Sequence, residues 1–138
     1  MKISAHVTNS EGNHQITLKT GENSHSIHIP PRPSGFGSSA NGGELLFLAL
    51  ATCYCNDIYR EAANRNIKVE RVEVDVEGDF GAEGEPARNV NYRARVTAHA
   101  DEEDIRALML HTDSATEIQN TLRVLTPVTL SHIEVLKA

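Results

Sequence analysis

The segment that decides the fold is residues 41–65, NGGELLFLALATCYCNDIYREAANR. Its first half is apolar and its second half polar, and Leu45, Ala49 and Cys53 follow one another at a spacing of four. Because residues four apart share a helix face, the pattern predicts one long helix whose buried stripe ends at Cys53. A thiol at that border is sheltered by apolar side chains and can still be reached by a polar group or a substrate. A reactive cysteine needs this setting, although a structural cysteine can also occupy it.

The chain before this helix is predicted to be a three-stranded meander followed by a loop. Apolar and polar residues alternate over residues 3–7, 16–18 and 27–29, as in strands with one buried face. Residues 30–43 are rich in Pro, Gly and Ser, and loops of this kind often line sites. The loop ends at an Asn that is followed three residues later by a Glu, as in a capping box that starts a helix.

The chain after the helix is predicted to continue as strand, strand, helix and strand. Residues 72–76 alternate Val with acidic residues, and residues 90–98 alternate apolar residues with Asn, Arg and Thr, which favours an antiparallel hairpin with cross-strand charge pairs. Residues 101–104 form an acidic first turn of a helix, with a short second helix around residues 115–123. Residues 128–136 suit a final strand with a bulge. The predicted order is βββ, long α, ββ, α, β, which is an α+β fold.

Composition fits a single domain over residues 1–138. Aromatic residues make up only 4% of the chain and Trp is absent, so the core is thin and a subunit partner would help to cover it. The net charge of -6 argues against a nucleic-acid partner. The sequence shows neither a membrane-spanning segment nor a signal peptide, so we expect a cytoplasmic protein whose two cysteines are free thiols.

The neighbours of Cys53 within the helix leave several alternatives open. Cys55 points about 200° away from Cys53, so a disulfide between them would require local unwinding. A metal site is not expected, because a second pair of ligands at zinc-like spacing is missing, and no cofactor is predicted. Asp57, one turn later, would oppose thiolate formation, whereas Arg60, two turns later, would favour it.

The sequence resembles the OsmC/Ohr family of osmotically induced and organic hydroperoxide resistance proteins. In that family an Asn-Pro-Glu-like start leads through a Leu/Ala run to a cysteine, as residues 41–53 do here. Residues 59–63, the strand that follows them, and residues 120–123 with 127–130 are also similar to the family. The resemblance implies an OsmC-like fold, a tight intertwined homodimer and active sites at the subunit interface.

The resemblance also implies a chemistry. In the peroxidase members, a cysteine on the central helix attacks the O–O bond of an organic hydroperoxide, and a second cysteine resolves the sulfenic acid. An Arg and a Glu favour the thiolate, and an external dithiol regenerates the enzyme.

The family's residues carry over to this chain only in part. Cys53 matches the first cysteine, whereas the position of the second falls on Thr116, whose hydroxyl cannot form a disulfide. The assisting Glu falls on Gly43, one residue before Glu44. Arg32 is the only Arg before the helix, and it is either a helper of Cys53 or a solvated loop residue. The candidate catalytic residues are therefore Cys53, Arg32 and Glu44.

Three functions remain open at this point. The first is a thiol peroxidase that acts through Cys53 and is regenerated by an external thiol reductant. The second is a non-catalytic OsmC-like homodimer that binds a small apolar ligand at its interface. The third is a thiol-redox sensor or a purely structural dimer.

Overall fold

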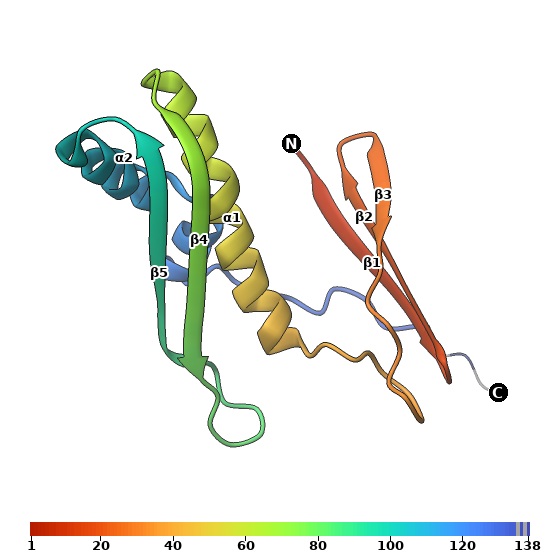
Figure 1. Ribbon diagram of the computed structural model, residues 1–138. Coiled ribbons are helices and arrows are strands. Elements are labelled where there is room, and N and C mark those ends of the chain that lie inside the picture. Colours follow the sequence, from red (N-terminus) through yellow and green to blue (C-terminus); the bar gives the residue numbers. More distant parts are fainter. Residues whose placement is uncertain (135, 137) are drawn as a thin grey trace. The chain divides into compact units, whose positions relative to one another are not determined.

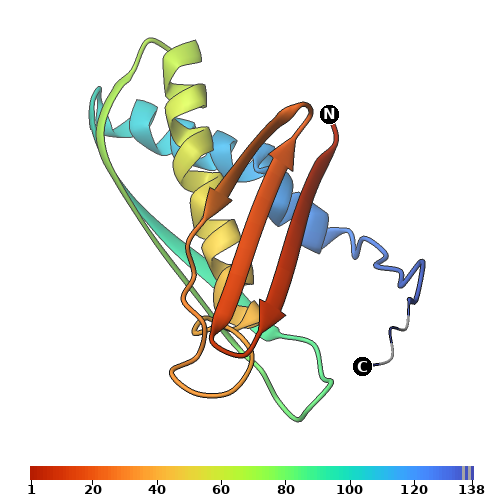
Figure 2. The ribbon, with the colours of Figure 1, turned by 90° about the vertical axis from the view of Figure 1, so that its right-hand side faces the viewer.

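A computed structural model describes residues 1–134, 136 and 138 of the chain. The chain divides into two compact units, Met1–Leu46 and Phe47–Ala138, and each unit is described by itself (Figures 1 and 2). The α+β character predicted from the sequence is confirmed. None of the helices in the described residues is long and apolar enough to cross a membrane.

The first unit contains the predicted meander. Its strands are β1 (Ile3–Ser10), β2 (Asn13–Thr20) and β3 (Asn23–Ile27), paired antiparallel in the order β1-β2-β3. Val7 pairs with Ile16, and Ile16 pairs with Ile27, so these apolar side chains share one face of the sheet. The strands are joined by tight turns, and Gly12 and Gly21 supply the positive φ that such turns need.

Helix α1 (Gly42–Asn64) begins at the predicted capping box. The Asn41 side-chain oxygen accepts the Glu44 backbone N–H at 2.9 Å, and the Glu44 carboxylate accepts the Asn41 backbone N–H at 2.7 Å. Two backbone donors that the helix cannot pair internally are thereby satisfied. The start of the long helix is therefore encoded locally.

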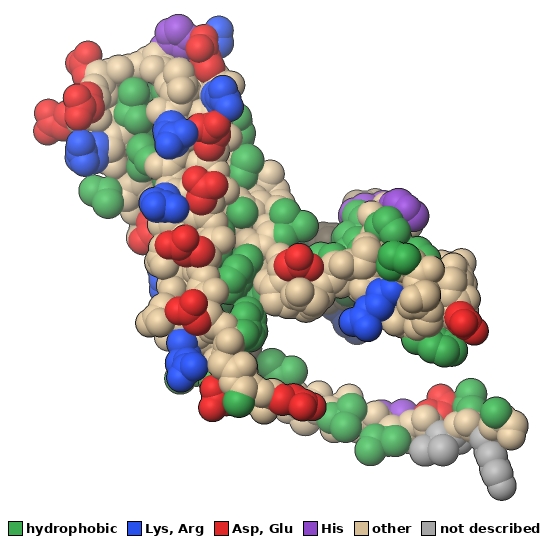
Figure 3. Space-filling model, turned by 60° about the horizontal axis from the view of Figure 1, so that its bottom comes forward, with side chains coloured by type: hydrophobic (Ala, Val, Ile, Leu, Met, Phe, Trp, Pro, Cys, Tyr) green, Lys and Arg blue, Asp and Glu red, His purple; other side chains and the backbone are tan. Residues whose placement is uncertain are grey.

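The second unit holds the rest of α1, a hairpin and two helices. These elements are β4 (Lys68–Asp79), β5 (Arg88–His99), α2 (Glu102–Ala115) and α3 (Glu117–Arg123). The predicted cross-strand charge pairs are present, with Arg95 bound to Glu73 at 2.7 Å and Arg93 to Glu77 at 3.8 Å. Figure 3 shows acidic and basic side chains interspersed over this unit, which supports a solvated charged face.

The core of the second unit is small and mostly aliphatic. Tyr54, Ile58 and Ala62 from α1 pack with Leu108 from α2, and half-buried apolar side chains of β4 and β5 close the cluster. The Tyr54 hydroxyl donates to the Met109 carbonyl at 3.1 Å. Burying an aliphatic side chain such as Ile58 stabilises the fold by about 1.5–3 kcal/mol. This packing fixes the rotation of α1 about its axis.

A polar cluster ties α2 and α3 to the hairpin. The Tyr92 hydroxyl of β5 donates to the Asp113 carboxylate, which also accepts the Arg123 guanidinium at 2.7 Å. Arg123 donates further to the Asp113 carbonyl at 3.0 Å. The end of α2 and the end of α3 are therefore held together beside β5.

Two sequence predictions about the fold are wrong. The buried stripe of α1 does not end at Cys53, because Asp57 and Glu61 in the polar half are buried as well. The helices α2 and α3 cover this half, and periodicity within α1 cannot reveal partners that come from elsewhere in the chain.

The predicted final strand over residues 128–136 is also absent from the described residues. Residues 124–134 and 136 are irregular, and Val135 lies outside the described residues. Alternating apolar residues form a strand only where another strand offers backbone partners. Within the described part of the chain, β1 to β5 pair only among themselves.

Candidate functional site

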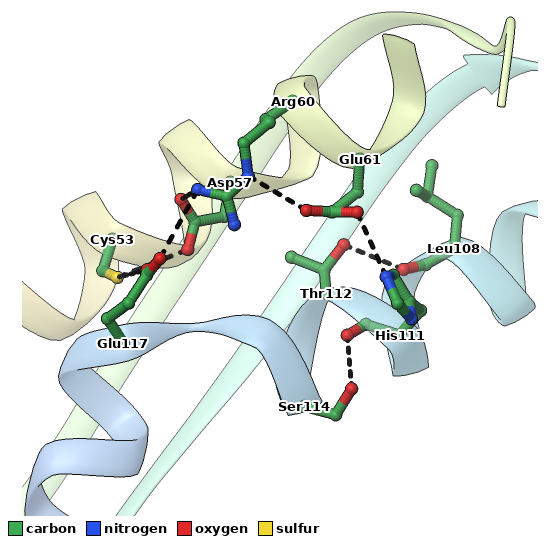
Figure 4. A network of polar contacts seen from close by, with 9 residues as sticks. All are labelled: Cys53, Asp57, Arg60, Glu61, Leu108, His111, Thr112, Ser114 and Glu117. Atoms are coloured by element: carbon green, nitrogen blue, oxygen red, sulfur yellow. Dashed lines mark hydrogen bonds and ion pairs between the residues drawn. The ribbon is translucent and has the colours of Figure 1, made fainter. Parts of the chain in front are cut away.

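Cys53 lies half-buried on α1, and two carboxylate groups lie close to its sulfur (Figure 4). The Cys53 thiol donates to Asp57 Oδ2 at 3.5 Å and faces Glu117 Oε2 at 3.9 Å. Asp57 comes from the next turn of the same helix, whereas Glu117 is the first residue of α3. The site therefore joins residues that are 64 positions apart in the sequence.

Helix α3 is anchored where it can present Glu117 to α1. The Thr116 backbone N–H donates to the Thr112 carbonyl at 3.1 Å, and the Thr116 hydroxyl donates to the Asp113 carbonyl at 2.9 Å. Further along, Gln119 Nε2 donates to the Leu50 carbonyl of α1 at 3.0 Å. The buried Thr116 and Gln119 thus fix the turn on both sides of Glu117.

Arg60 contacts the carboxylate oxygens of Asp57 and Glu117 that point away from the sulfur. Its Nη1 lies 2.8 Å from Asp57 Oδ1 and 3.8 Å from Glu117 Oε1, while its Nε donates to Glu61 Oε1 at 2.9 Å. The remaining oxygens, Asp57 Oδ2 and Glu117 Oε2, are the ones that face the sulfur. Glu61 also pairs with His111 Nε2 at 3.1 Å, so the network reaches α2 (Figure 4).

These neighbours keep the Cys53 thiol protonated. Burial raises the pKa of Cys53 above its ordinary value of 9.0, and the negative charges of Asp57 and Glu117 raise it further. A hydrogen bond from the Ile118 backbone acts in the opposite direction. Of the two neighbours on α1, Asp57 opposes formation of the Cys53 thiolate. Arg60 donates its hydrogen bonds to the carboxylates of Asp57 and Glu61 rather than to the sulfur.

The two carboxyl groups differ from each other. Burial raises the pKa of Asp57, although the Arg60 charge partly opposes this effect. Backbone hydrogen bonding holds the pKa of Glu117 below its usual range, and contacts with Asp57 and Arg60 add to that. Asp57 is thus the group of the pair that holds a proton more readily.

The same atoms do not make a convincing metal site. One ligand atom each from Cys53, Asp57 and Glu117 lies within 4.8 Å of the other two. However, the Arg60 guanidinium already neutralises part of this charge, and it would repel an incoming cation. The cluster is therefore a thiol with two carboxylate oxygens as its hydrogen-bond acceptors.

The structure places the other candidate residues in the first unit. The Arg32 backbone N–H donates to the Gly37 carbonyl at 3.1 Å, in a loop closed by a bridge between Pro31 and Ser38. The Glu44 carboxylate serves the helix cap. The roles of Arg32 and Glu44 beside Cys53 stay predictions.

Cys55 is a free thiol on a different side of α1. It lines an open pocket together with Ala51, Thr52, Asn56 and Val74. On an α-helix it points about 200° away from Cys53.

Glu117 is the site residue that the sequence analysis missed. Its signal was indirect, because it directly follows Thr116, the residue that the resemblance predicts at the position of the family's second cysteine. A residue next to that position is expected near the first cysteine whenever the register is right.

The fold and the site define an α+β protein with a half-buried thiol on its long helix. The family model described as OsmC-like protein matches residues 35–131, and the chain therefore belongs to the OsmC-like family. No curated protein matches the chain.

Three solved structures illustrate the similarity of fold. An OsmC-like protein of unknown function from Vibrio cholerae has a TM-score of 0.62 at 15% identity, covering 88% of this chain and 93% of its own. An OsmC-like protein from Mycoplasma pneumoniae has a TM-score of 0.59 at 18% identity, covering 88% and 86%. An organic hydroperoxide resistance protein OsmC from Legionella pneumophila has a TM-score of 0.57 at 19% identity, covering 89% and 90%.

Proposed function

We propose that this OsmC-like protein reduces organic hydroperoxides through Cys53 and an external thiol reductant. The observation that carries the proposal is the Cys53 thiol, half-buried on α1 with a carboxylate oxygen 3.5 Å away as a hydrogen-bond acceptor. A nucleophile beside a base is the common arrangement for covalent catalysis. The Legionella pneumophila relative, named for hydroperoxide resistance, supports the choice of substrate class.

The reaction begins with attack of the Cys53 sulfur on the distal oxygen of the hydroperoxide. The S–O bond forms as the O–O bond breaks, so that Cys53 becomes a sulfenic acid and the hydroperoxide leaves as an alcohol. The sulfur is oxidised by two electrons and the peroxide is reduced by two. The thiol proton ends on the alcohol, and the step is balanced without another reactant.

Regeneration requires a thiol from outside the chain. Thr116, at the position of the family's resolving cysteine, carries a hydroxyl that is engaged with the Asp113 carbonyl. Two external thiols would therefore return Cys53 to its reduced form, yielding their disulfide and water. A compartment that keeps thiols reduced, such as the cytoplasm, suits this cycle.

Arg32 and Glu44 belong to the proposal as residues that assist Cys53. Arg32→Ala is expected to slow oxidation of Cys53 if the loop arginine assists, whereas a solvated arginine would leave the rate unchanged. Glu44→Gln keeps most of the cap geometry and isolates the effect of charge.

The proposal includes a homodimer built from single OsmC-like domains over residues 1–138. Exposed apolar side chains in the C-terminal segment support a subunit partner, since Val128 is 98% and Leu130 80% exposed. Light scattering tests this part, and a monomer at micromolar concentration would contradict it.

Mass spectrometry with a sulfenic-acid trap tests the activity. Reduced protein is mixed with about one equivalent of tert-butyl hydroperoxide, and the labelled cysteine is mapped. We expect rapid labelling of Cys53, loss of labelling in Cys53→Ser and retention in the matched control Cys55→Ser. Absence of label at Cys53 would rule out the peroxidase.

One observation favours a second function, a non-catalytic dimer that binds a small apolar ligand. Burial and two negative charges raise the pKa of Cys53, which slows any reaction that needs a free thiolate. Under this alternative, Cys53→Ser would leave ligand binding intact. A redox sensor would instead change its oligomeric state or its stability when Cys53 is oxidised.

A further inference from the structure

The geometry around the sulfur assigns a double role to the carboxyl pair, an inference that rests on the proposed function. We propose that Asp57 and Glu117 together take the proton from the Cys53 thiol and return it to the alkoxide that leaves the hydroperoxide. Arg60 is a positioning residue for the pair. The pair would then supply the proton transfers of a peroxidase centre whose second cysteine is replaced by Thr116.

The first support is the division of oxygens between the sulfur and the guanidinium. Asp57 Oδ2 and Glu117 Oε2 face Cys53 Sγ at 3.5 and 3.9 Å, while Oδ1 and Oε1 face Arg60 Nη1 at 2.8 and 3.8 Å. Each carboxyl therefore has one oxygen toward the thiol and the other toward Arg60, which donates a hydrogen bond to Asp57 and forms an ion pair with Glu117. A group that exchanges protons with a reacting atom needs this kind of orientation.

The second support is the proximity of the two carboxyl groups. One oxygen of each carboxyl group lies within 4.8 Å of an oxygen of the other and of the Cys53 sulfur. Two carboxylates at this distance resist being ionised together, and one of them stays protonated more readily than an isolated acid. The pair can therefore accept a proton through one group and donate one through the other.

The third support is the chemistry of the leaving group. An alkoxide is far more basic than a thiolate, so cleavage of the O–O bond is accelerated when an acid protonates the departing oxygen. In the proposed step the thiol proton passes to the pair, the sulfur attacks the distal oxygen, and the pair protonates the alkoxide. The carboxyl groups end the step in their original protonation state.

Within the described residues of the second unit, the charged groups of this network come from three helices. Asp57, Arg60 and Glu61 come from α1, Glu117 comes from α3, and His111 of α2 reaches the network through Glu61. The buried Glu61 is held by Arg60 and His111 and does not face the sulfur. Its part is to keep Arg60 in place.

The experiment compares two reactions of Cys53 in the same proteins, on a Cys55→Ser background. Alkylation by iodoacetamide needs the thiolate but no proton for its leaving group, whereas oxidation by tert-butyl hydroperoxide needs both. Glu117→Gln removes a negative charge near the sulfur, so alkylation at neutral pH should become faster. Oxidation relative to alkylation should fall by about a hundredfold, as expected for loss of an acid–base group.

Three variants sharpen the comparison. Asp57→Asn, like Glu117→Gln, should speed alkylation and lower the rate of oxidation relative to alkylation. Glu117→Asp should restore part of the relative oxidation rate. Glu103→Gln is the matched control, because this exposed residue lies about 18 Å along α2 from its C-terminal end. It should leave both rates unchanged.

The outcomes separate this inference from the proposed function. If alkylation and oxidation accelerate in parallel in Glu117→Gln, the pair only disfavours the thiolate, and the proton-transfer role is overturned while the peroxidase stands. If wild-type Cys53 is alkylated but never oxidised, the peroxidase fails and the inference fails with it. Circular dichroism of each variant verifies that the fold is retained.

Discussion

Helix α1 carries two neighbouring stripes of side chains, and the residues of one stripe directly precede those of the other in the sequence. Tyr54, Ile58 and Ala62 form an apolar stripe, and they pack against α2 and the hairpin. The residue before each of them belongs to a polar stripe, made of Cys53, Asp57 and Glu61. Both stripes contact other elements, one through apolar packing and the other through hydrogen bonds and ion pairs.

The comparison shows how a small core can bear a reactive group. The apolar stripe stabilises the fold and sets the rotation of α1, and that rotation brings the polar stripe to His111 of α2 and Glu117 of α3. The packing of the apolar stripe, which includes Tyr54 next to Cys53, thus determines which groups surround the Cys53 sulfur. Substitutions in the two stripes should therefore separate stability from reactivity.

The largest effect is expected in the apolar stripe. Ile58→Ala removes a fully buried side chain and should lower the free energy of unfolding by about 3 kcal/mol, through lost burial and a cavity. Urea unfolding measures it. Leu110→Ala, at a 68% exposed position of α2, is the matched control, and an equal loss there would contradict this assignment of the core.

A smaller loss of stability is expected at Tyr92 of β5, whose ring packs against Tyr54 of the apolar stripe. Tyr92→Phe keeps the ring beside Tyr54 but removes the hydrogen bond to the Asp113 carboxylate. Because Arg123 still holds that carboxylate, the free energy of unfolding should fall by only about 1–2 kcal/mol. Tyr59→Phe, at an exposed position of α1, should be neutral, and equal values for both variants would refute the role of Asp113.

A substitution at the cap acts on both stripes together. Asn41→Ala removes the acceptor for the Glu44 backbone N–H and should cost about 1 kcal/mol in thermal or urea unfolding. Asn41→Ser restores a cap and should recover most of that stability. An unchanged unfolding curve for Asn41→Ala would show that packing alone fixes the helix start.

The smallest effect is expected at Arg60, which binds the carboxylates of the polar stripe. The raised pKa of Cys53 predicts that alkylation of the wild type increases with pH and inflects above 9.0. Arg60→Ala removes the nearby positive charge and should shift this profile to higher pH, slowing alkylation at pH 8 by about two- to fivefold for a half-exposed charge. Arg106→Ala, an exposed control on α2, should not shift it, and faster alkylation in Arg60→Ala would contradict the network.

The sequence predicted the elements better than it predicted their burial. The capping box, the meander and the charged hairpin rest on contacts between residues close in the chain, and all three are confirmed. The final strand failed because a strand depends on a distant partner. The buried Asp57 and Glu61 were missed for the same reason, since a polar residue looks solvated until its partners are known.

The sequence by itself determined the long helix, the strands before and after it, and the likeness to the OsmC-like family that places a thiol at Cys53. Only the tertiary structure decided what that thiol faces. Periodicity describes one element at a time, whereas the charge around Cys53 depends on Glu117, 64 residues further along the chain. Electrostatic interactions act through space, so the protonation of this sulfur follows from packing rather than from the order of residues.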